Sequence, residues 1–311
     1  KTSMPSKSWS RRLCETVVCH KKMKIRLPKI LNEIKANKKL QSLFNEICFQ
    51  LDNDIRYYCT PIDAISFGRT GSNGSHFCFL TDFGLNTNLE EAPIIFVNPS
   101  EFEYEEVKLI ANNINEFFGL ICYVKGTEFF VHDFRSKENL NTFILEQESF
   151  LKEDEIDITM MNILFEDFLD KYKVNLIKNP IKYLKEIKDD RNSKIQQKTD
   201  NGLGIINQDE NQLLNLFDFN KNDLSDIEEY LNNSSKIEKF LFYREFMYKF
   251  NGNRNWDKNF SLEDYLYQQY WKKKMNTAYN KVYTAITPKR RDCVYTGTLV
   301  AIKKDRKKIL E

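Results

Sequence analysis

The feature that most constrains the fold is a strand–turn–strand pattern in the first third of the chain. Ala64–Phe67 is apolar and rich in β-forming residues, and the polar run after it contains Asn73-Gly74. Both residues of that pair accept positive φ, so the pair predicts a tight hairpin turn. The return strand, His76–Phe83, is expected to place three aromatic side chains on one face, because side chains alternate along a strand: Phe77, Phe79 and Phe83.

A third strand and several helices are expected around this hairpin. Ile94–Val97, between two prolines, predicts the strand. A helix is expected from about Ile30 to Leu51, because its apolar residues recur at helical spacing. Ser100–Glu103 is a capping-box pattern, and we expect it to open another helix. The apolar stripe of that helix comprises Val107, Ile110, Ala111, Ile114, Phe117, Phe118 and Ile121. A short strand is expected at Glu128–Val131.

From about residue 140 the pattern changes to helices and polar loops. Asn179-Pro180 is a helix start, and 188–212 is polar enough for a linker or exposed loop. Ser225 with Glu228, and Ser261 with Asp264, are further capping-box candidates. The sequence therefore predicts an α+β fold, a small antiparallel sheet with flanking helices followed by a mostly helical C-terminal region. We expect a basic arm at 1–28, the α+β domain at 29–138, a helical region at 139–292, and a short hairpin with a basic tail at 293–311.

The net charge of +2 hides a strong segregation of charge along the chain. Residues 1–40 hold 12 Lys and Arg against 2 acids, and residues 271–311 hold 12 against 3. The remaining 41–270 hold 23 basic and 40 acidic residues, a net charge of −17. Such segregation bears on partners more than on fold. No apolar run is long enough for a membrane span, and the 7 scattered cysteines suit a reducing, cytoplasmic compartment better than a disulfide framework.

Two fragments match pieces of protein kinases: Asp82-Phe83-Gly84 and Val300-Ala301-Ile302-Lys303. In kinases the lysine precedes the Asp-Phe-Gly, and a His-Arg-Asp loop lies between them. Here the order is reversed and His-Arg-Asp is absent, so we interpret both matches as coincidences. No P-loop or dinucleotide fingerprint is present either.

Two segments carry metal-ligand residue types at short spacing. Oxygen-bearing side chains fall at positions 1, 3, 5, 9 and 12 of a calcium-loop pattern: Asp218, Asn220, Asn222, Asp226 and Glu229. Position 6 of the pattern is Asp223, where the sharp turn of such a loop needs Gly. An Asx-rich turn is the favoured interpretation, and calcium stays open. The Cys14-x4-Cys19-His20 segment has no second ligand pair at zinc spacing.

Catalytic residue types are scarce. The chain has three histidines, and His76 and Asp82 could line a pocket together with Arg69. We interpret these two residues as an ordinary solvent-facing pair. We therefore expect neither an enzyme nor a bound cofactor.

The first half resembles the SUKH superfamily over about Leu27 to Val124. The resemblance rests on the Ala64–Phe79 hairpin with its glycine turn, on Pro93–Val97, and on Leu109–Phe118, which reads Leu-Ile-Ala-Asn-Asn-Ile-Asn-Glu-Phe-Phe. Leu27-Pro28 is similar to the Leu-Pro before the family's opening helix, whereas the Phe-Leu pair expected after it is missing. The resemblance implies an α+β domain that binds proteins without catalysis. Many members are immunity proteins that neutralise a toxin, often a nuclease.

Together these features favour a protein-binding module whose acidic surface contacts a basic partner such as a toxin domain. The candidate contact residues are acids beside the expected core: Glu90, Glu91, Glu101, Glu103, Glu105 and Glu106. The alternative is a nucleic-acid-binding protein acting through its basic termini. In that case Lys272–Lys274, Lys289–Arg291 and Lys303–Lys308 would neutralise phosphates, and nearby aromatic residues would stack on bases.

Overall fold

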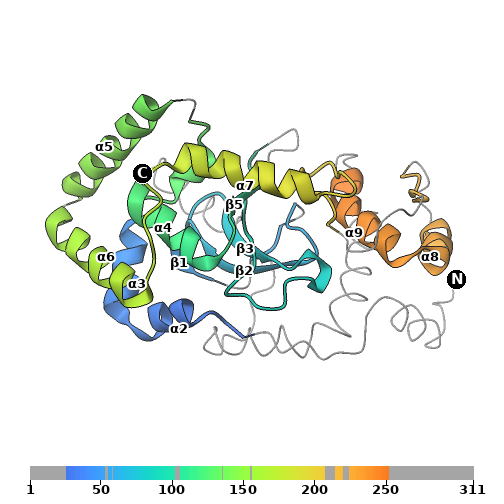
Figure 1. Cartoon of the computed structure of the whole chain (residues 1–311), viewed down its shortest axis with the longest axis horizontal. Helices are drawn as coiled ribbons and strands as arrows, with labels where there is room; N and C mark the ends of the chain where they lie inside the picture. The colour runs from blue at the N-terminus through green and yellow to red at the C-terminus, as the bar shows by residue number, and fades with distance from the viewer. Residues whose placement is uncertain are drawn as a thin grey trace, which may run out of the picture.

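The computed structural model describes residues 26–52, 55–57, 59–101, 106–134, 136–154, 156–206, 214–219 and 224–251, with the backbone alone at 224–225, 228 and 246–251. The fold is α+β, as expected: a five-stranded antiparallel sheet carries helices, and a helical region follows it (Figure 1). The predicted basic arm up to residue 25, the Ser261 capping box and the hairpin at 293–302 lie outside the described residues.

The sheet has the strand order β1-β2-β3-β4-β5, so each strand pairs with its neighbour in sequence. The strands are β1 (Gln50–Leu51), β2 (Ala64–Arg69), β3 (His76–Leu80), β4 (Ile94–Val97) and β5 (Val107–Ala111). The predicted hairpin and the strand at 94–97 are confirmed. Asn73 and Gly74 have φ values of 50° and 75°, the positive values from which the turn was predicted.

Alternation along the strands divides the core into two layers. One face carries Phe67, Phe77, Phe79 and Phe96 into the main hydrophobic core. The other face carries Cys78, Leu80, Ile95 and Val97 into a smaller cluster, which Leu203 helps to cover. The predicted position of Phe83 is wrong, because β3 ends at Leu80 and Phe83 lies in a 3-10 turn at Asp82–Gly84.

The single helix predicted from Ile30 to Leu51 is instead two helices and a strand. Helix α2 (Lys29–Ala36) ends at Asn37, whose side chain accepts hydrogen bonds from the Lys39 and Leu40 amides and so caps α3 (Lys38–Glu46). Leu51 belongs to β1, where it pairs with Gly68. The apolar spacing behind the prediction runs from Leu40 to Leu51, and it does not continue in phase from Ile30 and Ile34 across Asn37.

The helix predicted to begin at Ser100 starts 14 residues later, since α4 is Ile114–Val124. Val107, Ile110 and Ala111 belong to β5, which pairs with β4 and satisfies the backbone groups on that edge. The cap is Asn113, which accepts a hydrogen bond from the Glu116 amide at 2.9 Å. The strand predicted at Glu128–Val131 is also wrong, because this segment is a 3-10 helix that buries Phe129 and Phe130.

The second half adds five helices within the described residues: α5 (Lys137–Glu153), α6 (Ile158–Tyr172), α7 (Pro180–Lys194), α8 (Leu224–Asn233) and α9 (Lys236–Asn251). The predicted start at Asn179-Pro180 is confirmed. In Figure 1, α5 and α6 lie at one end of the sheet, α7 runs beside β5, and α8 and α9 lie at the other end.

These helices share the core of the sheet. Phe165 and Phe168 of α6 pack against Phe44 of α3, with ring centroids 5.7 and 5.0 Å apart. The segment after α7, predicted as a linker or exposed loop, buries Leu203 and Ile205. The core therefore runs across residue 138, where the sequence suggested a domain boundary.

Candidate partner-binding site

The six glutamates selected from the sequence do not form one exposed cluster in the described part of the chain. Glu91 is exposed, but Glu90 is half-buried and accepts a hydrogen bond from the Lys29 amide. Glu101 accepts one from the Asn98 side chain, and Glu106 is buried. Glu103 and Glu105 lie outside the described residues. Their role in binding stays a prediction.

The structure does not bring His76, Asp82 and Arg69 together around a pocket. His76 is fully buried, with Nδ1 2.8 Å from the Gly74 carbonyl and Nε2 3.0 Å from the Thr60 hydroxyl. Its Nδ1–H donates to the carbonyl and Nε2 accepts from Thr60, which is the arrangement of a neutral ring. Burial lowers the pKa of His76 to about 4. Arg69 lies at the hairpin end and pairs with Asp52.

Asp82 belongs to a buried cluster of two aspartates and two arginines. Arg191 of α7 donates to both oxygens of the Asp82 carboxylate, at 2.7 and 3.2 Å. Arg244 of α9 donates to Asp63 Oδ2 at 2.5 Å and lies 3.8 Å from Asp82 Oδ1. All four residues are at most 6% exposed. Each carboxylate therefore has a guanidinium partner, and the charges of the cluster cancel.

This Asp–Arg cluster also fixes the backbone around it. Arg191 Nε donates to the Leu203 carbonyl and an Arg244 guanidinium nitrogen donates to the Gly204 carbonyl. Phe83 stacks on Phe240 of α9, with centroids 4.2 Å apart. Burial raises the pKa of Asp63 and the nearby Arg244 charge opposes that rise. The cluster holds α7, α9 and the 197–205 loop against the sheet. The kinase-like Asp82-Phe83-Gly84 segment is therefore part of a buried ion-pair cluster in this structure.

The cysteines of the described part are free thiols. Burial raises the pKa of Cys78 to about 12, and it also raises the pKa of Cys48, Cys59 and Cys122. Thiols held in this protonated form are weak nucleophiles. Within the described ranges no group of three His, Cys, Asp or Glu side chains is placed to hold a metal ion. The calcium-loop pattern lies partly outside those ranges, at 220–223.

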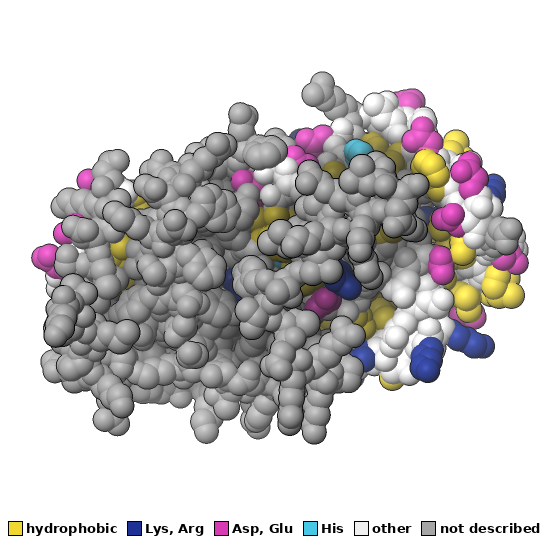
Figure 2. Space-filling view, turned by 180° about the vertical axis from the view of Figure 1, so that it is seen from behind, with side chains coloured by type: hydrophobic (Ala, Val, Ile, Leu, Met, Phe, Trp, Pro, Cys, Tyr) yellow, Lys and Arg dark blue, Asp and Glu magenta, His cyan; other side chains and the backbone are white. Residues whose placement is uncertain are grey.

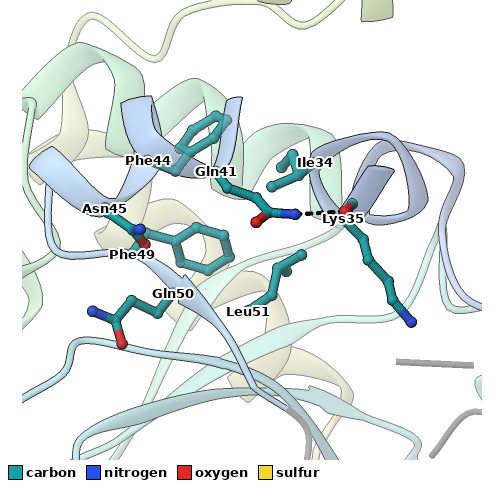
Figure 3. Close-up of a pocket in the computed structure, with 8 residues that line it drawn as sticks. All are labelled: Ile34, Lys35, Gln41, Phe44, Asn45, Phe49, Gln50 and Leu51. Atoms are coloured by element: carbon teal, nitrogen blue, oxygen red, sulfur yellow. Dashed lines mark hydrogen bonds between the residues drawn. The ribbon is translucent and has the colours of Figure 1, made fainter. Parts of the chain in front are cut away.

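A cavity of about 480 Å³ lies between α2, α3 and β1 (Figure 3). Its apolar walls are Ile34, Phe44, Phe49 and Leu51. Gln41, Asn45 and Gln50 add amide groups to its lining, and the Gln41 side chain donates a hydrogen bond to the Lys35 carbonyl. The Lys35 ammonium extends away from the other labelled side chains. The eight lining residues include no carboxylate, imidazole or thiol side chain, and their one charged group is that of Lys35.

Four of the eight large apolar side chains that are exposed in the described part lie elsewhere, on α5 and α6. Leu145, Phe150, Met160 and Ile163 are between 47% and 66% exposed. Figure 2 shows hydrophobic and acidic side chains interleaved along the right-hand edge, where these two helices lie. Sequence reasoning missed these residues, three of which, Leu145, Met160 and Ile163, lie off the buried stripe of their helix. It also missed Asp63, Arg191 and Arg244, for which the sequence offers no local pattern.

Comparison with known proteins leaves the family open, because no protein-family model matches the chain. No curated protein matches it either. In the part of the chain that the structure describes, no helix is both long and apolar enough to cross a membrane.

Proposed function

We propose that the chain is a non-catalytic protein-binding module, similar to the SUKH superfamily, that neutralises a basic partner such as a toxin domain. The proposal places it in the cytoplasm. Support comes from the order of elements in the first half, in which helices precede a hairpin-based antiparallel sheet and α4 follows the last strand. The free thiols of Cys48, Cys59, Cys78 and Cys122 suit a reducing compartment.

The observation that carries the proposal is the acid excess between the two basic ends of the chain. Residues 41–270 hold 40 acidic and 23 basic residues. Many of these acids are exposed on α5, α6 and α7, including Glu146, Glu153, Glu166 and Asp167. A surface of this kind attracts a basic partner and repels nucleic acid. A nuclease domain is basic where it holds phosphates, and an acidic protein competes for that surface.

The second candidate, nucleic-acid binding, depends on the basic termini. Residues 1–40 and 271–311 carry net charges of +10 and +9. It predicts affinity for a polyanion that falls steeply with salt and disappears when residues 272–311 are deleted. Unchanged binding after that deletion would remove the tail from consideration.

The test of the proposed function combines capture of the protein partner with protection of cells against that partner's toxicity. The tagged chain is expressed in its native cell, and the proteins that co-purify are identified by mass spectrometry. We expect a basic protein, and we expect co-expression of the chain to rescue cells from that protein's toxicity. Recovery of RNA or DNA alone would favour the second candidate. Recovery of no basic protein, with no protection against the products of neighbouring genes, would refute the immunity function.

A further inference from the structure

We propose that the partner contacts the outer edge of helices α5 and α6, and this inference rests on the proposed function. The α5–α6 edge is defined by four exposed apolar residues, Leu145, Phe150, Met160 and Ile163, and five exposed acids, Glu146, Glu153, Asp154, Glu166 and Asp167. The matching partner surface is an apolar patch flanked by Lys and Arg.

The apolar part of the edge is largely exposed to solvent. Each helix buries a different stripe in the core, Leu140, Phe143 and Leu151 on α5, and Met161, Phe165 and Phe168 on α6. Leu145, Met160 and Ile163 lie outside these stripes, whereas Phe150 lies seven residues after Phe143 and on its face of α5. The four are 66%, 59%, 52% and 47% exposed in chain order. They are four of the eight large hydrophobic side chains that are exposed in the described part. Such a concentration of exposed apolar residues marks an interaction site more often than chance exposure does.

The charged part of the edge is strongly acidic. Residues 137–173 contain 10 acids and 4 lysines, a net charge of −6. Two of those lysines are already paired, Lys171 with Glu33 and Lys173 with Asp170. Met160, Ile163 and Asp167 follow i, i+3, i+7 spacing, so a carboxylate lies on the same face of α6 as the two apolar residues. The edge therefore offers apolar contact and negative charge together (Figure 2).

Charge complementarity decides what can occupy this edge. A second copy of the chain would bring the same acids face to face across a symmetric interface, and the like charges would repel. Nucleic acid would place phosphates against carboxylates. A basic protein gains from both features, because the carboxylates speed its approach and the apolar side chains supply most of the affinity.

The test uses a defined probe and the full chain. The probe is a fluorescein-labelled Lys–Leu peptide that forms an amphipathic helix, and its reference is the same peptide with Ser in place of each Leu. Binding is measured by fluorescence anisotropy. The apolar variant is Met160→Ser with Ile163→Ser, and its control is Leu85→Ser with Leu216→Ser, two exposed leucines outside α5 and α6. Circular dichroism checks that each variant is folded.

We expect the Lys–Leu peptide to bind the wild type at least about tenfold more tightly than the Lys–Ser peptide. The apolar variant should lose that preference, and the control should keep it. Glu166→Gln with Asp167→Asn should weaken the salt dependence of binding more than Asp189→Asn with Asp190→Asn on α7, which changes the net charge equally. Equal binding of the two peptides by the wild type, or an apolar variant that binds like the control, would overturn the inference.

The two proposals fail separately. If a basic partner is captured and protection is seen while the peptide preference is absent, the α5–α6 edge is wrong and the proposed function stands. If the peptide preference behaves as expected and cells gain no protection, the edge is a binding surface for some other basic protein and the immunity function fails.

Discussion

At the residue scale, the least replaceable interactions are the buried charges. Arg191 and Arg244 come from the second half of the chain, and Asp63 and Asp82 come from the sheet region. A buried ion pair adds little over a well-packed apolar pair, but removal of one partner leaves an uncompensated charge in a low-dielectric site. Substitution of either arginine is therefore expected to cost far more than substitution of a surface lysine.

Arg191→Ala should lower the free energy of unfolding by about 3 kcal/mol, the lower end of the range for a broken buried pair, because Arg244 remains 3.8 Å from Asp82. The control is Lys185→Ala on the same helix. Lys185 pairs with Asp189 on the surface, where solvent screens the pair, so its loss should cost much less than the loss of Arg191. Urea unfolding of both variants measures the difference. Equal losses would contradict the structural role given to the Asp–Arg cluster.

His76 makes stability depend on pH. Its pKa is about 4 in the folded state and 6.5 in a model compound, so the unfolded chain binds the proton more readily between these values. The stability that neutral His76 contributes is therefore fully present above about pH 6.5 and is lost as the pH falls toward 4. The contribution of His76 to that loss between pH 7 and pH 5 is about 2 kcal/mol.

The measurement is urea unfolding of the wild type and of His76→Gln at both pH values. Glutamine can still hydrogen-bond to Thr60 or Gly74 but does not titrate. The variant should lose about 2 kcal/mol less than the wild type on acidification. The same pH dependence in both proteins would mean that His76 is not buried in the neutral form.

At the scale of the element, close packing decides where glycine is required. Gly119 lies in the middle of α4, a position where alanine ordinarily stabilises a helix by about 1 kcal/mol. A Cβ at this position would come within 2.3 Å of the Asn175 carbonyl oxygen, which belongs to the segment between α6 and α7. The backbone of that segment is also held by a hydrogen bond from the Ile177 amide to the Gly119 carbonyl.

Gly119→Ala should therefore destabilise the protein by about 1 to 3 kcal/mol, the usual cost of overpacking, despite the better helix propensity of alanine. At Gly126 the nearest atom to an added Cβ is the end of the Gln147 side chain, at 3.0 Å, which can move aside. Gly126→Ala should be milder, and thermal unfolding compares the two. A stabilised Gly119→Ala protein would show that α4 does not pack closely on 174–177.

At the scale of the whole molecule, the two halves share one hydrophobic core and one buried Asp–Arg cluster. Phe165 and Phe168 enter the core beneath the sheet, and Arg244 compensates the charge of Asp63 from 181 residues away. Separation of the two halves would expose apolar surface and would remove the guanidinium partner of a buried carboxylate. This arrangement differs from a sheet domain with an independent helical appendage.

Thermal unfolding should therefore show one transition over the described body, with equal calorimetric and van't Hoff enthalpies. A chain that ends at residue 206 lacks Arg244 and leaves Asp63 without its guanidinium partner, so its melting temperature should be lower than that of the full chain. Two separate transitions in the full chain, or an unchanged melting temperature on truncation, would show that the halves fold independently.

The sequence by itself determined the elements whose cause is local. Asn73-Gly74 accepts positive φ, Ile94–Val97 lies between prolines, and Asn179-Pro180 suits a helix start, so the hairpin, β4 and the beginning of α7 were predictable. The charge segregation, from which the class of partner is proposed, is also a property of the sequence alone.

Tertiary structure decided the rest, because the causes lie in residues far apart in the chain. Val107, Ile110 and Ala111 fit a helical stripe. They form β5 instead, because their backbone groups hydrogen-bond to the edge of β4 that β3 leaves open. The Asp–Arg cluster joins residues 63, 82, 191 and 244, and no local pattern marks them as partners. The α5–α6 edge became visible only after packing had shown which apolar residues the core does not use.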